Sequence, residues 1–538
     1  MGVRRVLWII LLVLFSCILW KCWYLKVHHV KNIEIKIQNQ QYRPVLNSKK
    51  NKRFLHIKSD VIDFTVDLYS GEICESRLLK YHSTSQSFQK LKLLNCNNHH
   101  YEIMSGIINN HNDIFKNKKQ FFYTTSHCNF LLLNGQKILF VPIVSIKSNG
   151  IRIVKTFIIQ KGSYNIGIDY KICNFNKYSS SCSIFGAVKK SFYIKKSIFH
   201  IYKNALTNQF SNIAYSNCDK KYHKLSFSDL KKHHNFYLNS HYSWISIFQK
   251  YFSISWILNT CDKHIVYTHL NNSNALTVGY ILKCTIPSYS SKIIRVNLWM
   301  GPNIPYKMKL VAPNFDLIID YGWFGFISRP LFCFLKILNL LFNNWGYSII
   351  FITIIMRIIT YPLLKSQYIS SIKLKILHPK INEIKQKFKD NKKKINSETL
   401  NLYKKYQVNP FSGLIPVLIQ MPIFIALYYM LVNTIDLRHA SFIFWIHDLS
   451  DRDPYYVLPV FMALTIFFMQ KTAVVRSLPK FINLKFMYLI PVFCVFFFLW
   501  FPSGLLLYYS FSNIMTALQQ LFIQYNIKKN KKYKFLNE

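Results

Sequence analysis

Acidic residues, glycine and charge in general are scarce in this sequence. Its 538 residues include only 22 Asp and Glu and 15 Gly, and charged residues make up 17%, whereas soluble domains carry about 25%. Hydrophobic residues reach 51%. This composition excludes collagen-like, disordered and small disulfide-rich proteins. Together with long apolar runs near the start and throughout the last third, it predicts a polytopic α-helical membrane protein.

Motifs of enzymes and metal sites are also missing. We find no paired carboxylates, nucleophile elbow, glycine-rich phosphate loop or nucleotide motif, and the twelve cysteines include no C-x-x-C pair and no zinc spacing. We therefore expect no catalytic residues, no metal and no cofactor. The cysteines are expected to be buried thiols. Whether those outside the membrane form disulfides stays open at this point.

Positive charge, by contrast, is abundant. Lys and Arg number 69, which gives a formal net charge of +47. This would suit a nucleic-acid-binding protein. However, the abundance of Lys, Asn, Ile, Phe and Tyr is also expected of an A/T-rich genome, and lysines anchor cytoplasmic loops. The net charge alone therefore identifies no partner.

The amino terminus has the features of an uncleaved membrane anchor. Arg4 and Arg5 precede an apolar run over residues 6–20, and no small-residue cleavage site follows. We expect an anchor over residues 1–24 with its amino terminus in the cytoplasm. A polar linker over residues 25–52 is expected to follow it.

Five further apolar segments in the last third are long enough, or nearly so, to cross a bilayer. They lie at residues 346–364, 414–435, 455–470, 486–500 and 503–524. With the amino-terminal anchor they predict six transmembrane helices, the last five forming a helical domain over residues 344–525. The segment 486–500 spans only about 22 Å as a helix, so the bilayer must thin there or the helix must start earlier.

Charge in the loops orients these spans. Residues 365–406 contain twelve lysines and three acidic residues, and residues 471–485 and the tail 526–538 are also basic. Residues 436–454 contain four Asp against two Arg. Because cytoplasmic loops are enriched in Lys and Arg, both termini are expected in the cytoplasm, and residues 436–454 outside.

The large external region, residues 53–320, has the pattern of an all-β sandwich. Short runs rich in Ile, Val, Phe and Tyr alternate with Asn, Ser and Gly turn residues. A sugar-active enzyme is the alternative, which the missing acid/base pair disfavours. Residues 321–343 follow with apolar side chains at three- and four-residue steps. They predict an amphipathic helix along the outer membrane surface, with a buried connector as the alternative.

Arg357 is an unusual residue for the middle of a span. An arginine there costs about 2.5–3.5 kcal/mol on insertion scales, and the other four carboxyl-terminal spans contain no acidic partner. We therefore expect it to face a water-filled groove rather than an ion pair. Polar residues at helical spacing would line the same groove: Thr353, Gln420, Tyr509, Ser512, Asn513, Thr516, Gln519 and Gln520.

The cytoplasmic segment 366–408 is predicted to be a helical hairpin. Leu374, Leu377, Ile381, Ile384 and Phe388 form a coiled-coil seam, residues 390–396 make the turn, and Ser397 caps the second helix. Its lysine-rich face is expected to be solvated and close to lipid. Contact with ribosomal RNA or anionic lipid headgroups is a secondary possibility.

Four long strings resemble one known family. NNWGYSIIFITIIMRIITYPL, KYQVNPFSGLIPVLIQMPIFIALYYML, LRHASFIFWIHDLSDRDPYYVLP and FFFLWFPSGLLLYYSFSN are similar to the YidC/Oxa family of membrane protein insertases, over residues 320–525. The anchor followed by a large β domain resembles the Gram-negative bacterial YidC type. The resemblance implies a bacterial inner-membrane insertase and chaperone with a periplasmic β-supersandwich, and Arg357 as the positive charge of its groove.

The partners implied by this resemblance are nascent membrane proteins, with or beside the Sec translocon, and the lipid bilayer. The ribosome is a further partner that the basic hairpin and tail would suit. A polytopic transporter or channel is the alternative function. Transporters usually contain inverted repeats and broken helices, and we find no repeat among the five spans.

Overall fold

The computed structural model describes residues 54–83, 89–94, 101–108, 122–146, 150–191, 212–219, 221–225, 230, 235–260, 262–271, 275–388, 391–406, 415–472, 491 and 493–529. The predicted anchor 1–24, linker 25–52 and most of the tail 526–538 lie outside these residues, as do residues 486–490 and 492 of the predicted span 486–500. Two compact units are present, and the chain passes from one to the other between Asp320 and Tyr321.

The first unit consists mainly of β-strands. In chain order these are β1 Phe54–Lys58, β2 Ile62–Asp67, β3 Glu72–His82, β4 Lys90–Leu94, β5 Tyr101–Ile108, β6 Asn129–Leu131, β7 Ile138–Ile146, β8 Ile151–Gln160, β9 Asn165–Asn174, β10 Ser180–Ser191, β11 Asn212–Ser216, β12 His223–Leu225, β13 Asn235–Ser240, β14 Ser243–Phe248, β15 Phe252–Leu258, β16 His264–Leu270, β17 Ala275–Ile286 and β18 Ser291–Pro302.

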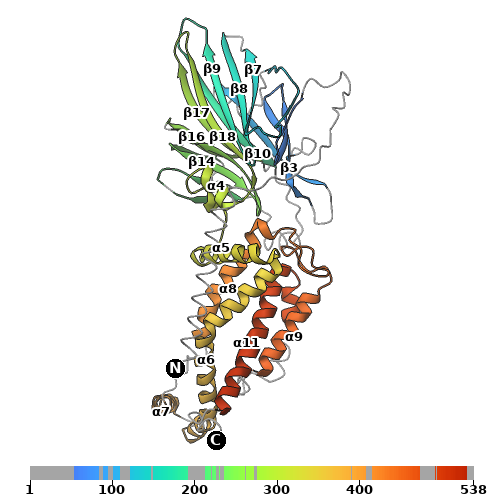
Figure 1. Ribbon diagram of the computed structural model, residues 1–538. Helices are drawn as coiled ribbons and strands as arrows, with labels where there is room; N and C mark the ends of the chain where they lie inside the picture. The colour runs from blue at the N-terminus through green and yellow to red at the C-terminus, as the bar shows by residue number, and fades with distance from the viewer. Residues whose placement is uncertain are drawn as a thin grey trace, which may run out of the picture. The chain divides into compact units, whose positions relative to one another are not determined.

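These strands form two sheets (Figure 1). One runs in the order β13-β16-β17-β10-β5-β3-β2-β1-β6, with β4 paired to β3, and the other β12-β11-β14-β15-β18-β9-β8-β7. The pairs are antiparallel, except that β1 and β6 are parallel. In β8, buried residues alternate with more exposed ones, as expected for a strand with one face in a core. The predicted all-β sandwich is confirmed.

Large aromatic side chains fill the space between the sheets. Trp256 of β15 and Tyr280 of β17 come from opposite sheets, are fully buried and lie edge to face at 5.4 Å. Gly186 of β10 allows this approach, because a Cβ atom there would lie 2.8 Å from the Trp256 ring. Interior contacts of this size account for much of the stability of such a domain.

Two short helices close the unit, and the sequence pattern did not predict them. They are α4 Pro305–Val311 and η3 Phe315–Ile318. Phe315 is fully buried against Trp244 and Trp299, with ring centroids 5.4 and 5.7 Å away. A seven-residue helix completes only two turns, too few for its apolar period to be recognised in sequence.

The second unit is helical (Figure 1). Its described helices are α5 Gly325–Phe342, α6 Trp345–Lys387, α7 Lys392–Lys405, α8 Ile415–Asn433, η5 Ile435–Leu437, α9 Val457–Thr472 and α11 Ser503–Lys529. By length and composition, two segments of the described chain could cross a membrane, Gly325–Phe342 and Trp345–Leu374, and Gln420–Asn433 and Val457–Thr472 are shorter apolar helices. The six-span arrangement therefore stays a prediction.

Helix α5 lies across the ends of α6 and α8 (Figure 1). One face packs on the bundle through Leu331, Leu335 and Leu338, and the Ser328 hydroxyl donates to the carbonyl of Ala426 in α8 at 2.9 Å. Outside that face, Trp323, just before the helix, is 95% exposed and Phe326 73% exposed. This amphipathic division suits a helix at a membrane surface.

Helix α6 extends far beyond the predicted span. Its 43 residues measure about 64 Å, roughly twice the thickness of a bilayer core. The first arm of the predicted hairpin 366–408 is therefore the continuation of a membrane helix rather than a separate helix. Pro362 and Pro379 lie inside α6 without ending it.

The second arm, α7, begins earlier than predicted. Asn391 is its N-cap and accepts from the Lys394 amide at 3.1 Å. The prediction of Ser397 as the cap is wrong, because that residue lies within the helix. The predicted seam is present in its first part: Leu377 and Ile381 are buried against Leu374, Leu402 and Tyr403. Ile384 and Phe388, also predicted for the seam, are half-buried and lie outside this cluster.

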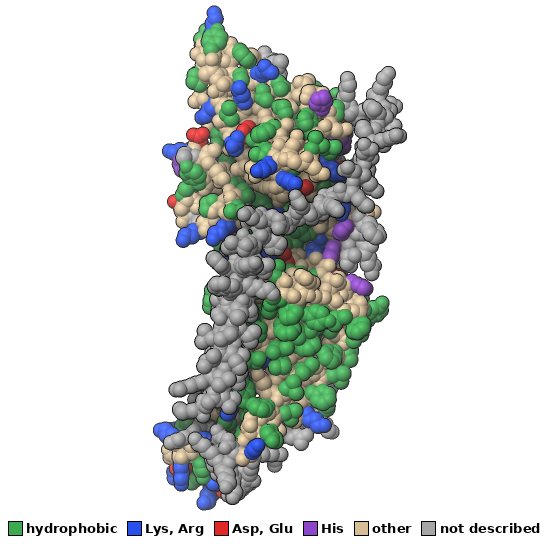
Figure 2. Space-filling model, in the orientation of Figure 1, with side chains coloured by type: hydrophobic (Ala, Val, Ile, Leu, Met, Phe, Trp, Pro, Cys, Tyr) green, Lys and Arg blue, Asp and Glu red, His purple; other side chains and the backbone are tan. Residues whose placement is uncertain are grey.

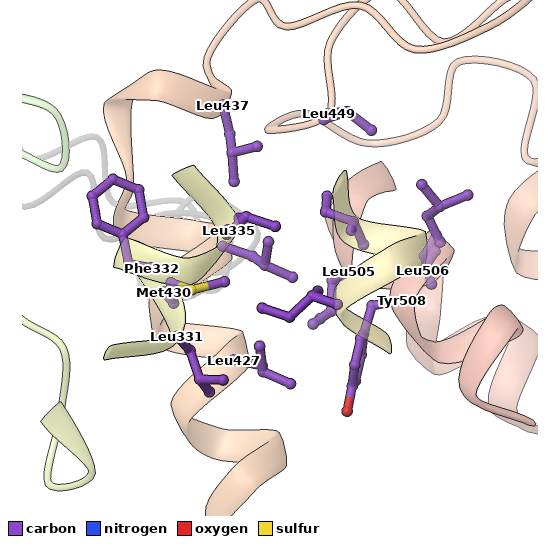
Figure 3. Close-up of a cluster of buried hydrophobic side chains, with 14 of the residues drawn as sticks. Leu331, Phe332, Leu335, Leu427, Met430, Leu437, Leu449, Leu505, Leu506 and Tyr508 are labelled. Atoms are coloured by element: carbon purple, nitrogen blue, oxygen red, sulfur yellow. The ribbon is translucent and has the colours of Figure 1, made fainter. Parts of the chain in front are cut away.

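A compact apolar cluster holds the helices of the second unit together (Figure 3). Leu335 of α5, Leu427 and Met430 of α8, and Leu505 and Leu506 of α11 are almost fully buried in it. The outward side chains of α9 are also apolar but exposed: Val460, Phe461, Leu464, Phe467 and Phe468. Figure 2 shows hydrophobic side chains gathered over the visible face of this unit, as expected for contact with lipid.

Candidate functional site

Arg357 joins α6 to α11. Its Nε donates to the Ser512 hydroxyl at 2.9 Å, and its Nη2 donates to the same oxygen. The helix that carries it is initiated by Asn344, whose side chain accepts from the amides of Gly346 at 2.8 Å and Tyr347 at 3.4 Å. Arg357 is half-buried, so its charge is partly withdrawn from solvent.

A second contact joins the same two helices. Gln519, seven residues after Ser512 and hence on the same face of α11, donates from Nε2 to the Arg357 carbonyl at 2.8 Å. The Thr360 hydroxyl also approaches this carbonyl, at 3.3 Å. Arg357 is thus held at both its side chain and its backbone.

Tyr508 and Gln420 complete this group, which we call the Arg357 cluster: Arg357, Gln420, Tyr508, Ser512 and Gln519. The hydroxyl of Tyr508 lies close to the side chains of Ser512 and of Gln420 in α8. Figure 3 shows the ring of Tyr508 leaving the apolar cluster, with its hydroxyl directed away from the labelled leucines. Three helices therefore contribute polar groups to one place.

The Arg357 cluster contains one cation and no carboxylate. In the part of the chain that the structure describes, Arg357 forms no ion pair with Asp or Glu, and its side-chain acceptor is a neutral hydroxyl. Neutral dipoles orient a guanidinium without cancelling its charge. The cluster is therefore a site of uncompensated positive charge among apolar helices.

Three of the other predicted groove residues have their side chains engaged elsewhere. The Thr353 hydroxyl is buried and donates to the Ile349 carbonyl of its own helix at 2.6 Å. Thr516 donates to the Ser512 carbonyl, also within its helix, at 2.8 Å. Tyr509 stacks edge to face on Phe424 of α8, with ring centroids 4.8 Å apart.

Asn513 faces a different helix from Ser512. Its Nδ2 donates to the Thr465 hydroxyl of α9 at 3.2 Å. Farther along, the Thr472 hydroxyl of α9 donates to Gln520 Oε1 at 2.7 Å, and Gln524 Nε2 donates to the Thr472 carbonyl at 3.0 Å. The polar residues of α11 thus form two separate sets, one toward α6 and one toward α9.

The helical period explains this division. Consecutive residues of a helix point about 100° apart, so Ser512 and Asn513 cannot face the same neighbour when α11 lies between α6 and α9. Sequence reasoning missed Tyr508 as a site residue. Its position four residues before Ser512 was the available signal.

The ends of three helices are tied together by the predicted external loop. The Asp453 carboxylate is buried and accepts from Trp445 Nε1 at 3.0 Å, from the Tyr455 amide at 3.1 Å and from the Leu458 amide, at the start of α9, at 2.7 Å. The Ser503 amide, at the start of α11, donates to the Asp451 carbonyl at 2.7 Å.

The start of α6 joins the same loop through a close contact. A Cβ atom on Gly346 would lie 2.0 Å from the Phe442 ring, so only glycine permits this packing. The loop therefore fixes the relative position of α6 and α11, and with it the distance between Arg357 and Ser512.

No group of three or more His, Cys, Asp or Glu side chains suited to a metal ion occurs among the described residues. The Arg357 cluster itself offers hydroxyl, amide and guanidinium groups, which would make a poor set of metal ligands. Its chemistry is suited to binding an anionic or polar group.

Comparisons with known proteins agree over nearly the whole chain. Residues 55–334 match the family described as "YidC periplasmic domain", and residues 337–531 match "60Kd inner membrane protein". "Membrane protein insertase YidC" of Buchnera aphidicola subsp. Acyrthosiphon pisum (strain 5A) is 41% identical over 99% of this chain and 100% of the relative. The protein of the same name from Blochmanniella floridana is 38% identical over 98% of each chain.

Among solved structures, "Active YidC insertase crystal structure with the first transmembrane domain resolved" matches 87% of this chain and 92% of its own, at 17% identity and a TM-score of 0.35.

A periplasmic β-sandwich followed by an apolar helical unit defines an inner-membrane protein with a large domain outside the bilayer. Within that class, the chain belongs to the YidC family of membrane protein insertases. The family membership predicted from the four strings is confirmed, and with it insertion of membrane proteins as the function. The transporter and sugar-active alternatives are not supported.

Proposed function

We propose that this insertase receives its substrates at the Arg357 cluster. The substrates are nascent inner-membrane proteins, and the cluster attracts the acidic or polar tail that must cross the membrane. One observation carries this proposal: the side chain of Arg357 is held by a neutral hydroxyl, so its positive charge remains available to an incoming anion.

The physical gain lies in desolvation. Moving an unpaired polar group from water into an apolar medium costs several kcal/mol, and a tail contains many such groups. Polar side chains from α6, α8 and α11 replace part of the lost hydration, and the apolar segment of the substrate then enters lipid. Burial of the apolar surface of the substrate in lipid provides the driving force for insertion, together with the membrane potential acting on acidic tails. Insertion in this scheme involves no covalent step and no cofactor.

The predicted site residues have unequal roles in this proposal. Gln420 and Ser512 contact the substrate together with Arg357. Tyr509, stacked on Phe424, borders the path of the substrate along α8. Thr353, Asn513 and Thr516 bond within the bundle and hold the helices in place.

We also propose six transmembrane helices with both termini in the cytoplasm. The basic loops 365–406 and 471–485 and the acidic loop 436–454 support this topology. Reporter fusions after residues 400, 445 and 538 test it. A reporter enzyme that is active only in the periplasm should be active when fused after residue 445 and inactive when fused after residues 400 or 538. Activity of the fusion after residue 538 would contradict a cytoplasmic carboxyl terminus.

The Sec translocon and the ribosome are proposed partners. The hairpin made by the end of α6 and by α7 carries exposed lysines, among them Lys380, Lys385 and Lys387 on α6. Anionic RNA would bind such a face in a salt-dependent manner. Co-sedimentation with ribosomes should fall when these lysines are changed to glutamine, whereas the same exchange at Lys309 in the β domain should have no effect.

Photocrosslinking tests the substrate site directly. A benzophenone amino acid replaces Tyr509 in one variant and Phe468 in another, so both positions exchange one aromatic ring for another. Phe468 lies on the exposed side of α9. Ribosome-bound chains of a single-spanning inner-membrane protein should crosslink from position 509 and not from 468. Equal yields would contradict a defined path.

A further inference from the structure

Two cysteines of the β domain lie directly opposite each other. Cys182 is in β10 and Cys284 in β17, and the antiparallel register pairs these two residues. Their sulfur atoms are 3.1 Å apart. Both side chains are buried, with 5% and 4% of their surface exposed. The two residues are far apart in sequence, so this contact exists only in the folded domain.

The backbone around the pair suits a disulfide bond. The β10–β17 ladder pairs twelve residues on each strand, so the two Cα atoms are held at the separation of cross-strand partners, about 4.5–5.5 Å. Disulfides connect Cα atoms about 4.4–6.8 Å apart. The sulfurs therefore need only small side-chain rotations to reach bonding distance.

The other thiols of this domain have different surroundings. The Cys218 sulfur lies 3.1 Å from the His241 carbonyl, and the Cys74 sulfur lies 3.9 Å from the Glu72 carbonyl. Cys173 is in the opposite sheet, where the register pairs it with Ser291 and Arg152. Within the described residues, only the Cys182–Cys284 pair brings two sulfurs together.

The compartment favours oxidation. Residues 55–334 match a periplasmic domain, and the bacterial periplasm allows disulfides to form and persist. We propose that Cys182 and Cys284 form a structural disulfide that fastens β10 to β17 in the periplasmic domain. The bond links segments separated by about 100 residues, a loop length at which a crosslink removes much conformational freedom from the unfolded chain.

The chemistry is an exchange with an external disulfide. The thiolate of one cysteine attacks the disulfide of a periplasmic thiol–disulfide oxidoreductase and forms a mixed disulfide. The second thiolate then attacks this bond, closes Cys182–Cys284 and releases the oxidoreductase as a dithiol. The cysteine pair loses two electrons and two protons, and the oxidoreductase, released as a dithiol, gains both.

The disulfide is expected to form during folding, before the two thiols are buried in the folded domain. Contact with Cys182, together with burial, raises the pKa of the Cys284 thiol, and buried sulfurs are out of reach of a protein oxidant. The pair lies only two residues from the end of the ladder, after Ser180–Ile286 and Ser181–Thr285. Fraying of this end, or its late closure, exposes both thiols.

Peptide mapping of the full chain tests the proposal. Cells that express the protein are quenched in acid, free thiols are blocked with N-ethylmaleimide, and peptides are analysed without reduction. We expect the peptide with Cys182 joined to the peptide with Cys284, while Cys173 carries the maleimide. In a host without the periplasmic thiol oxidant, the linked fraction should fall severalfold. If Cys182 and Cys284 are both found blocked in the wild-type host, the proposal is wrong.

Cysteine variants test whether the disulfide joins Cys182 to Cys284. Cys182→Ser should leave Cys284 blocked by maleimide, and Cys173→Ser should leave the linked peptide unchanged. Reduction of the wild-type protein should lower the midpoint of thermal unfolding of the β domain by about 5 °C or more. Reduction of Cys182→Ser should not change its midpoint. A linked peptide that joins Cys284 to any other cysteine would also overturn the assignment.

Discussion

Arg357 of α6 and Ser512 of α11 are joined by two hydrogen bonds from the guanidinium to one hydroxyl oxygen. The acceptor is neutral, so the bond positions the charge without cancelling it. The same pair of helices is joined again at Gln519, which donates to the Arg357 carbonyl. In the function proposed above, this fixed and uncompensated charge attracts the acidic tail of a substrate.

The charge of Arg357 should matter more than its shape. Arg357→Lys keeps the positive charge but loses the planar donor group, so it should retain most of the insertion of substrates with acidic tails. Arg357→Ala should reduce it about fivefold, the effect of about 1 kcal/mol of lost attraction. The measurement is insertion of one substrate with either an acidic or a neutral tail. Equal handling of the acidic tail by alanine and wild type would refute the electrostatic role.

Loss of the Arg357 side chain should affect the stability of the protein differently from its activity. Removal of a guanidinium from among apolar helices is favourable, so Arg357→Ala should not lower the thermal stability of the protein in detergent. A clear loss of stability would indicate that the arginine is a structural residue.

Two serines of α11 provide a matched comparison. Ser512→Ala removes the acceptor of Arg357 and should destabilise the helical unit by about 1–3 kcal/mol, with reduced insertion. Ser510 is also fully buried, but its hydroxyl has no hydrogen-bond partner among the described residues. Ser510→Ala should therefore be neutral or slightly stabilising. The measurement is thermal unfolding of both variants in detergent. If the two substitutions changed the unfolding midpoint equally, the contact between Ser512 and Arg357 would not stabilise the helical unit.

Asp453 should be essential for the external loop. Asp453→Asn places an amide donor where an oxygen accepts from Trp445 or from a backbone amide, and we expect a loss of about 1–3 kcal/mol. Asp451→Asn is the control, because the neighbouring helix bonds to the Asp451 backbone carbonyl and the side chain is exposed. The control should unfold like wild type.

Lys155 should give the β domain a specific pH dependence. It is fully buried, and its Nζ donates to the Gly71 carbonyl at 2.6 Å and to the Ser105 hydroxyl at 2.8 Å, both in the opposite sheet or its turns. Burial lowers the pKa of Lys155 to about 7. In the unfolded chain the pKa is about 10.4.

The direction of this effect follows from proton binding. Between about pH 7 and pH 10 the unfolded chain binds a proton at Lys155 that the folded domain lacks, so stability rises with pH by up to about 1.4 kcal/mol per pH unit. Lys155→Met should remove this contribution. Pulse proteolysis of the full chain in urea at pH 7, 8 and 9 measures the free energy of unfolding of the wild type and of Lys155→Met. If this free energy changed with pH in the same way in both proteins, the assigned role of Lys155 would be wrong.

The β domain should be largely dispensable for insertion. The division of the chain between Asp320 and Tyr321, and the position of the Arg357 cluster after it, support this expectation. Deletion of residues 55–320 should preserve complementation of a depletion strain. Deletion of 55–300 is a useful comparison, because it leaves Phe315 without Trp244 and Trp299 and should lower the amount of protein. Loss of insertion at normal membrane levels would refute dispensability.

Much of the fold could be read from local patterns. Alternation of apolar residues identified β8, and the apolar runs identified α6, α8, α9 and α11, because each pattern reflects the environment on the two faces of a single element. The seam of Leu377 and Ile381 was recognised for the same reason. The beginning of α7 was not, because Asn391 and Ser397 are both acceptable caps and only the contacts of the hairpin select between them.

The candidate site was only partly predictable. Arg357 stood out because a charge is rare inside a span. The polar stripe of α11 was visible as well, but the sequence could not divide it, since Ser512 contacts α6 and Asn513 contacts α9. Helical periodicity predicts which residues lie on the same face of a helix. It does not predict which neighbouring helix packs against that face.

By itself, the sequence determined the class of the protein, its family, the succession of a β region and apolar helices, and the one cation within the five predicted carboxyl-terminal spans. Only the tertiary structure decided which groups meet: Arg357 with Ser512, Asp453 with Trp445, and Cys182 with Cys284. Local patterns arise from the burial of single elements. Long-range pairs depend on the register and packing of whole sheets and helices, which many distant residues set together.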